Sequence, residues 1–345
     1  MQTEIRLPPF LCAESHSCSV FAGKNIKIEL SDCIQDGLYK RLSDMAKRKK
    51  SLLSLGSNLG NRKKNLADAV LKIQQAPDIF SVRVSQYHRS KPVGGPTGQE
   101  FFLNIAVEIS TTLSAPELLA TMKEIEAELG RERHARWDAR TIDIDILTLD
   151  RLVVSSPELV LPHPRMSLRR FVLEPVCELA GDQTHPETGW SYQRHLSHLQ
   201  QAGNYALTVN LTDVLPRDSL ADLRDNSSVF VSPSLPIART EEQLASNFDV
   251  LKQWGADEQF VLCNFAPREC LFQHPELIDA IERHERTVLT PRLLVILTDN
   301  IHNELRHQWV TKMMPNGIVM PWVFLDNFEK DLLTQELSAL ATCHL

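Results

Sequence analysis

A short acidic segment near the middle of the chain constrains the fold more than any other feature. Ile142-Asp143-Ile144-Asp145-Ile146 alternates apolar and acidic residues, which is the period of a half-buried β-strand. In such a strand the isoleucines face a core and the aspartates point together to the opposite side. Their carboxylates lie about 7 Å apart and repel each other unless a cation lies between them. The pattern predicts either a cation site or an exposed edge strand whose acidic residues keep it soluble.

The residues just before this strand favour the cation site. Arg136, Trp137 and Arg140 precede it closely. Carboxylate oxygens suit Mg²⁺, guanidinium groups suit phosphate oxygens, and an indole ring can stack on a flat heterocycle. We therefore expect a site for Mg²⁺, a polyphosphate and a planar ring.

Length, charge and cysteine content limit the class of protein. A chain of 345 residues is long enough for about two domains. The net charge of −7 argues against a general nucleic-acid binder, which usually has a strongly basic face. No apolar run approaches the length of a membrane span, and the N-terminus lacks a secretory signal pattern. The seven cysteines are scattered without metal-binding spacing, so we expect a cytoplasmic protein with reduced thiols and no nucleic-acid or membrane partner.

Residues 1–50 are expected to form a partly disordered N-terminal extension. Proline and serine are frequent at its start, and a short amphipathic helix is expected from Ile34 to Met45, followed by the basic run 47–50. That run suits either phosphate contact or, as we favour, a solvated helix end.

Residues 51–185 have the pattern of an α+β domain. Ser114 with Glu117 forms a helix-starting capping box, and Gly130 ends the same helix. The order β-α-β-β-α-β predicts a ferredoxin-like layer, one sheet with helices on one face. The expected strands are residues 51–55, 79–87, 101–109 and 142–147, and the expected helices are residues 61–75 and 114–129.

The remaining chain is expected to form a linker and a smaller α/β domain. Residues 186–203 are polar and rich in turn residues, so we take them as the linker. Within 204–345, the apolar runs 260–263 and 293–297 are typical of buried parallel strands.

Several motifs occur in a fixed order along the chain: residues 55–60, 90–94, 101–104, 136–146 and 161–166. Together they resemble the 6-hydroxymethyl-7,8-dihydropterin pyrophosphokinases of folate biosynthesis, over about residues 51–185. The resemblance implies a ferredoxin-like fold and transfer of diphosphate from ATP to the hydroxymethyl group of the pterin, giving AMP, with two Mg²⁺ ions.

The resemblance also assigns roles to individual residues. Asp143 and Asp145 match the Mg²⁺ ligands, and Arg131 and Arg140 match residues that stabilise the transferring diphosphate. Positions that contact ATP are matched by Glu126, Arg133, Trp137, Arg140, Ile146, His163 and Arg169. Positions of the pterin pocket are matched by Ser90, Val93, Phe102, Asn104, Trp137 and Phe171.

Some of these residues allow a purely structural interpretation. Glu126 could be an exposed helix side chain, and Arg136 could belong to a solvated loop. Phe102 is preferred to Phe101 because it lies two residues from Asn104 and so shares its face of a strand. Residues 56–60 do not fit the spacing of a phosphate-binding loop, and a tight turn is the better interpretation.

One departure from the family pattern motivates an alternative function. Asp138-Ala139 stands where the family usually has Gly-Pro. This changes backbone freedom and places a negative charge near the triphosphate. The alternative is a catalytically impaired nucleotide-binding scaffold that acts through its C-terminal domain.

That C-terminal domain weakly resembles the later part of the deoxynucleoside kinase fold. Residues 203–345 contain glycine only at positions 203, 255 and 317, so no glycine-rich phosphate loop is present. We expect a noncatalytic domain used for packing, regulation or dimerisation, and a homodimer would then form through it.

Overall fold

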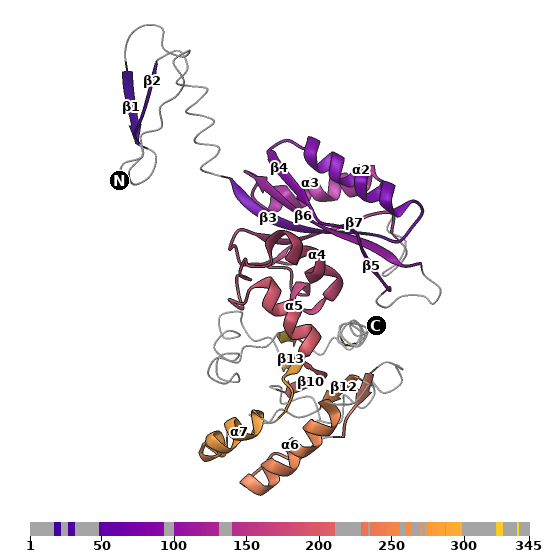
Figure 1. Ribbon diagram of the computed structural model, residues 1–345, viewed down its shortest axis with the longest axis vertical. Helices are drawn as coiled ribbons and strands as arrows, with labels where there is room; N and C mark the ends of the chain where they lie inside the picture. Colours follow the sequence, from indigo (N-terminus) through magenta and orange to yellow (C-terminus); the bar gives the residue numbers. More distant parts are fainter. Residues whose placement is uncertain are drawn as a thin grey trace.

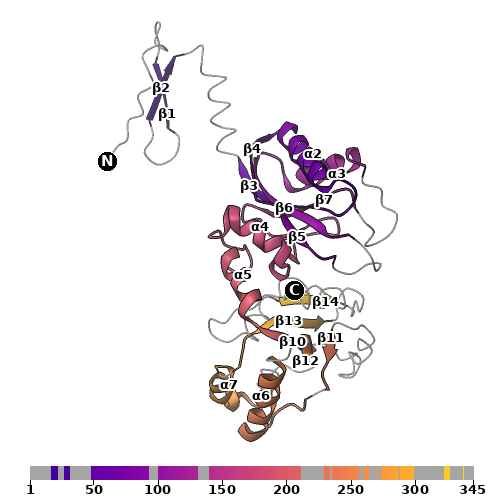
Figure 2. The ribbon, with the colours of Figure 1, turned by 45° about the vertical axis from the view of Figure 1, so that its right-hand side comes forward.

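In its described part, the computed structural model places two five-stranded sheets one after the other along one axis, with helices beside and between them (Figures 1 and 2). None of the helices it describes is both long enough and apolar enough to cross a membrane. The residues it describes are 17–21, 27–31, 48–92, 100–130, 140–210, 229–233, 235–255, 260–263, 270, 273–286, 288–298, 322–326 and 337.

The first sheet is antiparallel and has the strand order β4-β6-β3-β7, with β5 paired to β6. With α2 and α3 on one face, this arrangement agrees with the expected ferredoxin-like layer. Its elements are β3 (Lys49–Ser57), α2 (Arg62–Gln75), β4 (Ile79–Val84), β5 (His88–Ser90), β6 (Phe102–Thr111), α3 (Ala115–Glu128) and β7 (Asp143–Leu149).

Local signals set the ends of the two helices. The Asn61 side chain accepts the N–H of Lys64 at the start of α2. Ser114 and Glu117 form the predicted capping box at the start of α3. Gly130 follows α3 with a φ of +79°, a conformation that glycine adopts without steric cost.

Two expectations at the edges of this domain were wrong in detail. Lys49 and Lys50 do not end a helix, because they begin β3 and pair with Thr111 and Ser110. The expected strand 79–87 ends at Val84 as β4, and a separate strand, β5, begins at His88. Within the expected extension, β1 (Ser17–Phe21) and β2 (Lys27–Ser31) form an antiparallel pair. The expected helix 34–45 lies outside the described residues.

The helices do not cover only one face of the sheet, as expected. Alternate residues of β3 enter two different cores. Leu53 and Leu55 pack with α2 and α3, whereas Leu52 packs with α4 (Arg170–Ala180) and α5 (Tyr192–Gln201). Both faces of the sheet are therefore covered.

The segment expected to be a polar linker, residues 186–203, contains helix α5. Its buried residues Tyr192, His195, Leu196 and Leu199 recur every three or four positions, which places them on one helix face. The charged and polar residues that dominate the composition lie on the other face. The domain boundary itself stays a prediction.

The second sheet is parallel, and residues 260–263 and 293–297 lie in two of its strands, as expected. Its order is β11-β12-β10-β13-β14. The strands are β10 (Gly203–Asn210), β11 (Val229–Val231), β12 (Phe260–Cys263), β13 (Pro291–Thr298) and β14 (Trp322–Asp326). The other short elements are β8 (Val154–Ser155), β9 (Val160–Leu161), η2 (Met166–Leu168) and η5 (Pro275–Leu277).

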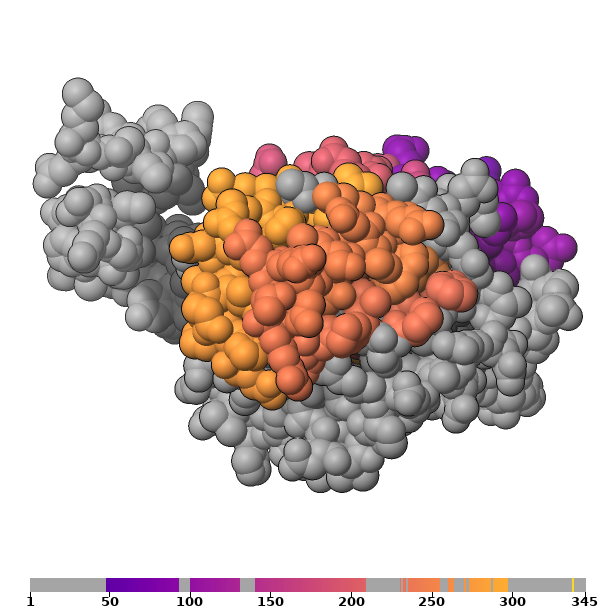
Figure 3. Space-filling model, turned by 90° about the horizontal axis from the view of Figure 1, so that it is seen from below, coloured from indigo at the N-terminus to yellow at the C-terminus, as the bar shows by residue number. Residues whose placement is uncertain are grey.

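Helices α4 and α5 form a layer that the two sheets share. Ala206, Leu262 and Leu293 of the second sheet belong to the same core as α4 and α5. The opposite face of this sheet packs against α6 (Glu241–Gly255) and α7 (Ile278–Glu285). These two helices lie at the end of the described structure opposite the first sheet (Figures 1 and 2), and their coral and orange atoms face the viewer in Figure 3.

Candidate active site

Strand register brings the predicted site residues to one face of the first sheet. Gly56 lies opposite Asn104 on one side and opposite Asp143 on the other. Asp145 pairs with Ser54, two residues earlier on β3. Residues opposite each other in a sheet share a face. Since Leu52 on this face contacts the α4–α5 core, the carboxylates and the amide lie on the α4 side.

The acidic strand has the predicted two-sided character. Ile142, Ile144 and Ile146 are buried in the core of α2 and α3. The side chains of Asp143 and Asp145 are 21% and 43% exposed. Because the Ile146 side chain lies on the other face, a nucleotide contact of this residue would involve its backbone.

Arg140 contacts the acidic pair directly. Its guanidinium donates a hydrogen bond to Asp143 Oδ2 at 2.5 Å. The backbone of Arg140 is held by Asn58, whose Oδ1 accepts the Arg140 N–H at 2.7 Å and whose N–H donates to the Arg140 carbonyl at 3.2 Å. This pair of hydrogen bonds fixes the point where residue 140 enters the site.

Asn58 and Asn65 are functional-site residues that the sequence reasoning did not find. The amide of Asn65, in α2, donates to the carbonyls of Leu59 and Thr141 at 2.8 and 3.1 Å. It thereby ties the bend after β3 to the segment before the acidic strand. The turn predicted at 56–60 is shorter than expected, because residues 56 and 57 still belong to β3; the chain bends at residues 59–61, where Gly60 has a φ of +62°. The available signal was two asparagines beside a glycine turn, a residue type that readily bonds to nearby backbone.

Glu126 is buried, with 4% of its surface exposed. Its Oε1 accepts the N–H of Ile144 at 2.7 Å, between the two aspartates in sequence. The interpretation of Glu126 as an exposed helix side chain was therefore wrong. The bond holds the start of β7 against α3, and the nucleotide contact stays a prediction.

His163 reaches the acidic face from the loop after β9. The backbone N–H of His163 donates to the Leu147 carbonyl at 2.8 Å, and the ring Nδ1 accepts the backbone N–H of Arg165 at 3.2 Å. The ring proton is thus assigned to Nε2, which lies 4.0 Å from Asp145 Oδ2. Burial, followed by the charges of Arg169 and Arg165, lowers the pKa of His163 to about 3. The ring is therefore neutral and presents an N–H to the site.

Helix α4 begins beside these groups. Arg169 is its N-cap residue, and the Arg169 guanidinium carbon lies 5.7 Å from the centre of the Phe171 ring. The unpaired N–H groups and the dipole at a helix N-terminus favour anions. This end of α4 therefore combines a cationic side chain with an aromatic ring.

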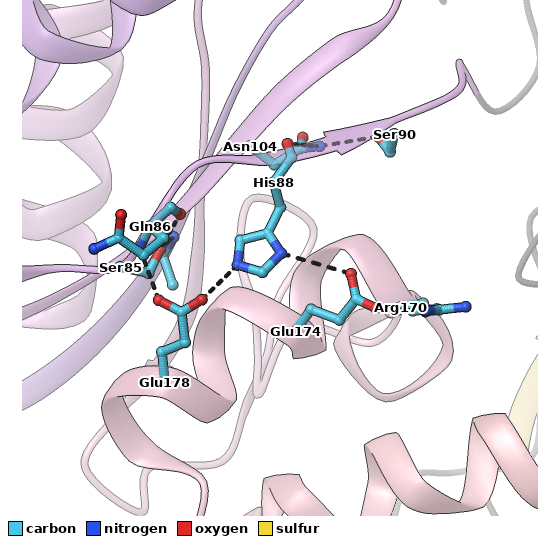
Figure 4. A network of polar contacts seen from close by, with 9 residues as sticks. Ser85, Gln86, His88, Ser90, Asn104, Arg170, Glu174 and Glu178 are labelled. Atoms are coloured by element: carbon cyan, nitrogen blue, oxygen red, sulfur yellow. Dashed lines mark hydrogen bonds and ion pairs between the residues drawn. The ribbon is translucent and has the colours of Figure 1, made fainter.

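The predicted pterin residues that the structure describes are close together. A Cβ on Gly56 would lie 3.1 Å from Asn104 Oδ1 and 3.6 Å from Phe102 Cδ1, so both side chains lie over this glycine. The Asn104 amide donates to Ser90 Oγ at 2.9 Å (Figure 4). Ser90, Phe102 and Asn104 therefore form one continuous surface.

Several predicted residues lie outside the described part of the chain. They are Val93, Arg131, Arg133, Arg136 and Trp137. Of the predicted catalytic arginines, the structure describes only Arg140, and the roles of the others stay predictions.

The carboxylate pair was tested as a metal site from its donor atoms. Among the described residues, no group of three or more His, Cys, Asp and Glu side chains is placed to hold a metal ion. A Mg²⁺ ion bound through one or two carboxylates, water and substrate phosphates needs no such group. Asp143 and Asp145 fit that kind of site.

Comparisons with known proteins match the first part of the chain. The family model 7,8-dihydro-6-hydroxymethylpterin-pyrophosphokinase (HPPK) matches residues 52–181. A 2-amino-4-hydroxy-6-hydroxymethyldihydropteridine pyrophosphokinase from Bacillus subtilis is 44% identical over 127 residues, which are 37% of this chain and 75% of that protein. The enzyme of the same name from Methylorubrum extorquens is 44% identical over 133 residues, 39% of this chain and 84% of that protein.

A solved structure of Plasmodium falciparum HPPK-DHPS with pteroate aligns with 86% of this chain and 79% of its own, at 10% identity and a TM-score of 0.36. So low a score carries no argument about the second sheet. The sequence relatives are decisive, because the chain covers most of their length at high identity. The chain belongs to the 7,8-dihydro-6-hydroxymethylpterin-pyrophosphokinase family.

Proposed function

We propose that this chain transfers diphosphate from ATP to 6-hydroxymethyl-7,8-dihydropterin, giving the pterin diphosphate and AMP in folate biosynthesis. Family membership supports the reaction. The observation that carries it to this chain is the shared face of Asp143, Asp145 and Asn104. Groups suited to a charged polyphosphate and groups suited to a planar amide-bearing ring lie side by side there.

The reaction displaces AMP from the β-phosphorus of ATP. The hydroxymethyl oxygen of the pterin forms a bond to the β-phosphorus. The bond between the β-phosphorus and the oxygen that bridges it to the α-phosphorus breaks. AMP leaves with the electron pair, and the hydroxyl proton passes to water. Such a transfer depends mainly on alignment and on stabilisation of charge.

The polyphosphate end of the site would be held by cationic and neutral donors. The Arg140 guanidinium and the Nε2–H of His163 are both directed to the acidic face, and each can donate to phosphate oxygens. Arg169 at the start of α4 adds a further cation. We propose the same kind of role for Arg131 and Arg133.

Asp143 and Asp145 would hold two Mg²⁺ ions together with the phosphates of ATP. When bound, these ions would offset the negative charge of the phosphate oxygens. The Arg140 guanidinium donates to Asp143 Oδ2, and His163 Nε2 lies 4.0 Å from Asp145 Oδ2, so bound Mg²⁺ would share the two carboxylates with these donors.

The pterin would bind between β6 and the start of α4. Asn104 offers an amide for the hydrogen-bonding edge of the ring, while Phe102 and Phe171 supply apolar walls. Ser90, Val93 and Trp137 complete the proposed pocket. Glu126 would act on the nucleotide side and also holds the acidic strand.

The test is AMP release from ATP, Mg²⁺ and 6-hydroxymethyl-7,8-dihydropterin by the full chain. We expect one AMP for each pterin diphosphate formed and no release without the pterin. Background-level AMP from folded protein that still binds ATP would reject the enzyme and favour the nucleotide-binding scaffold.

For residues 204–345 we propose a noncatalytic role in packing. The parallel sheet covers the α4–α5 layer, and the sequence that follows β10 offers no glycine for a phosphate site, since residues 211–228 contain none. The resemblance to deoxynucleoside kinases, a homodimer through this part and cytoplasmic localisation stay predictions. Light scattering on the purified chain tests the dimer.

A further inference from the structure

Strand β5 is the edge of the proposed pterin pocket, and it is only three residues long. It pairs with β6 where the pocket lies, with His88 opposite Asn104 and Ser90 opposite Phe102. The Asn104 amide donates to Ser90 Oγ at 2.9 Å. The direction of the Asn104 amide therefore depends on the position of β5.

The strand is interrupted at residues 85–87, between β4 and β5. The Oγ of Ser85 accepts the N–H of Ala106 at 2.9 Å, in the place where a regular strand would use its backbone. So short an edge strand has few ladder bonds of its own. Contacts outside the sheet must help to fix it.

Helix α4 supplies those contacts through two carboxylates (Figure 4). His88 Nε2 lies 2.6 Å from Glu178 Oε1, and His88 Nδ1 lies 3.6 Å from Glu174 Oε2. The second oxygen of Glu178 accepts the N–H of Gln86 at 2.7 Å. Glu174 also pairs with Arg170 at 2.5 Å.

The carboxylates share a helix face with the aromatic wall of the pocket. Phe171, Glu174 and Glu178 are spaced by three and four residues, which places them on one face of α4. Phe171 and Asn104 are thus carried by different elements. The His88–Glu178 contact joins α4 to β5, and β5 pairs with β6, which carries Asn104.

The state of Glu178 agrees with this geometry. Burial raises the pKa of its carboxyl, but the hydrogen bonds from the Gln86 N–H and the His88 ring outweigh burial, and the pKa lies below its ordinary value. An ionised carboxylate only accepts hydrogen bonds. His88 Nε2 is therefore the donor.

We propose that His88 and Glu178 are positioning residues that set the spacing between the Phe171 ring and the Asn104 amide, and so the affinity for the pterin. We call the His88–Glu178 contact the clamp. This inference rests on the proposed function. It predicts an effect on one substrate, because the clamp adjoins the pterin wall, whereas Asp143, Asp145 and His163 are held by other contacts.

The test compares His88→Leu, Glu178→Met and the double variant in steady-state AMP release. Loss of one hydrogen bond to a charged group is expected to raise the KM for the pterin about tenfold. The KM for ATP should stay within about twofold of wild type. The double variant should equal Glu178→Met, because His88→Leu breaks a contact that Glu178→Met already removes. His88→Gln keeps an N–H donor and should recover most of the affinity.

The control is Asp68→Asn, which removes a carboxylate paired with Lys64 on the exposed face of α2; it should leave both KM values unchanged. A pterin KM equal to wild type in both single variants would overturn the inference, and so would equal increases in both KM values. Fluorescence titration with the pterin alone separates the two proposals. An inactive wild type rejects the proposed function, whereas an active wild type with unaffected variants rejects only the clamp.

Discussion

Two buried histidines, His185 before α5 and His195 within it, should make the folded chain sensitive to acid. His185 is 4% exposed and His195 is fully buried, with their ring centres 5.5 Å apart. The Nδ1 of His185 accepts the N–H groups of Glu187 and Thr188, both at 3.3 Å. A ring that accepts at Nδ1 and is removed from water is held neutral by the fold.

Burial lowers the pKa of His185 to about 4. Burial, followed by the charges of His185, His198 and Arg194, lowers that of His195 to about 3. As the pH falls below about 6.5, these histidines become protonated in the unfolded chain but stay neutral in the folded chain. The free energy of unfolding is therefore highest above pH 6.5 and decreases as the pH falls towards the lower pKa values of the folded state. For His185 alone, the free energy of unfolding should fall by about 2 kcal/mol between pH 7 and pH 5.

The assay is urea unfolding of wild type and His185→Asn at several pH values, followed by circular dichroism. The asparagine Oδ1 can replace Nδ1 as acceptor but does not titrate. From pH 7 to pH 8 the two proteins should differ by a constant amount. From pH 7 to pH 5 the wild type should lose about 2 kcal/mol more than the variant. Parallel losses in the two proteins would show that His185 is not held neutral, and the reasoning would fail.

Three further predictions concern the site. Asp143→Asn and Asp145→Asn should each lower kcat/KM for AMP release about 100-fold or more, with circular dichroism unchanged; a variant with wild-type activity would remove that aspartate from the metal site. Asn58→Ala should lower kcat/KM about tenfold, because the Arg140 N–H loses its acceptor, the Asn58 side-chain oxygen, and an unchanged value would mean that this side-chain bond is dispensable. Glu126→Ala should lower the free energy of unfolding by about 1–3 kcal/mol, because it leaves the Ile144 N–H buried without its acceptor. Glu126→Gln keeps an oxygen and should lose less in the same urea titration; equal losses would contradict the role of this bond.

The parts of the fold that the sequence predicted well depend on local chemistry. The alternation at 142–146, the capping box at Ser114 and the glycine at 130 each act within a few residues. Such signals survive whatever packs around them. Helix starts, helix ends and the two faces of the acidic strand therefore agree with the structure.

The parts that the sequence did not predict depend on contacts between distant residues. Residues 79–87 alternate as one strand, and the break at Ser85 arises from the Ala106 N–H and from Glu178 on α4. The pair of hydrogen bonds between Asn58 and Arg140 joins residues that are 82 positions apart in the sequence. Neither partner shows in a local pattern, so the positioning contacts of the site had to come from the structure.

The shared α4–α5 layer changes how the two parts of the chain relate. Leu196 and Leu199 of α5 pack into one core with Leu262 and Leu293 of the second sheet. Burial of a leucine side chain stabilises by about 1.5–3 kcal/mol, so removal of residues 204–345 would expose an apolar face of this layer. The same layer carries Phe171, a proposed wall of the pterin pocket, and Glu178, which contacts His88 of β5. The second sheet can therefore influence the reaction without a catalytic group of its own, because it supports the helix that forms one wall of the site.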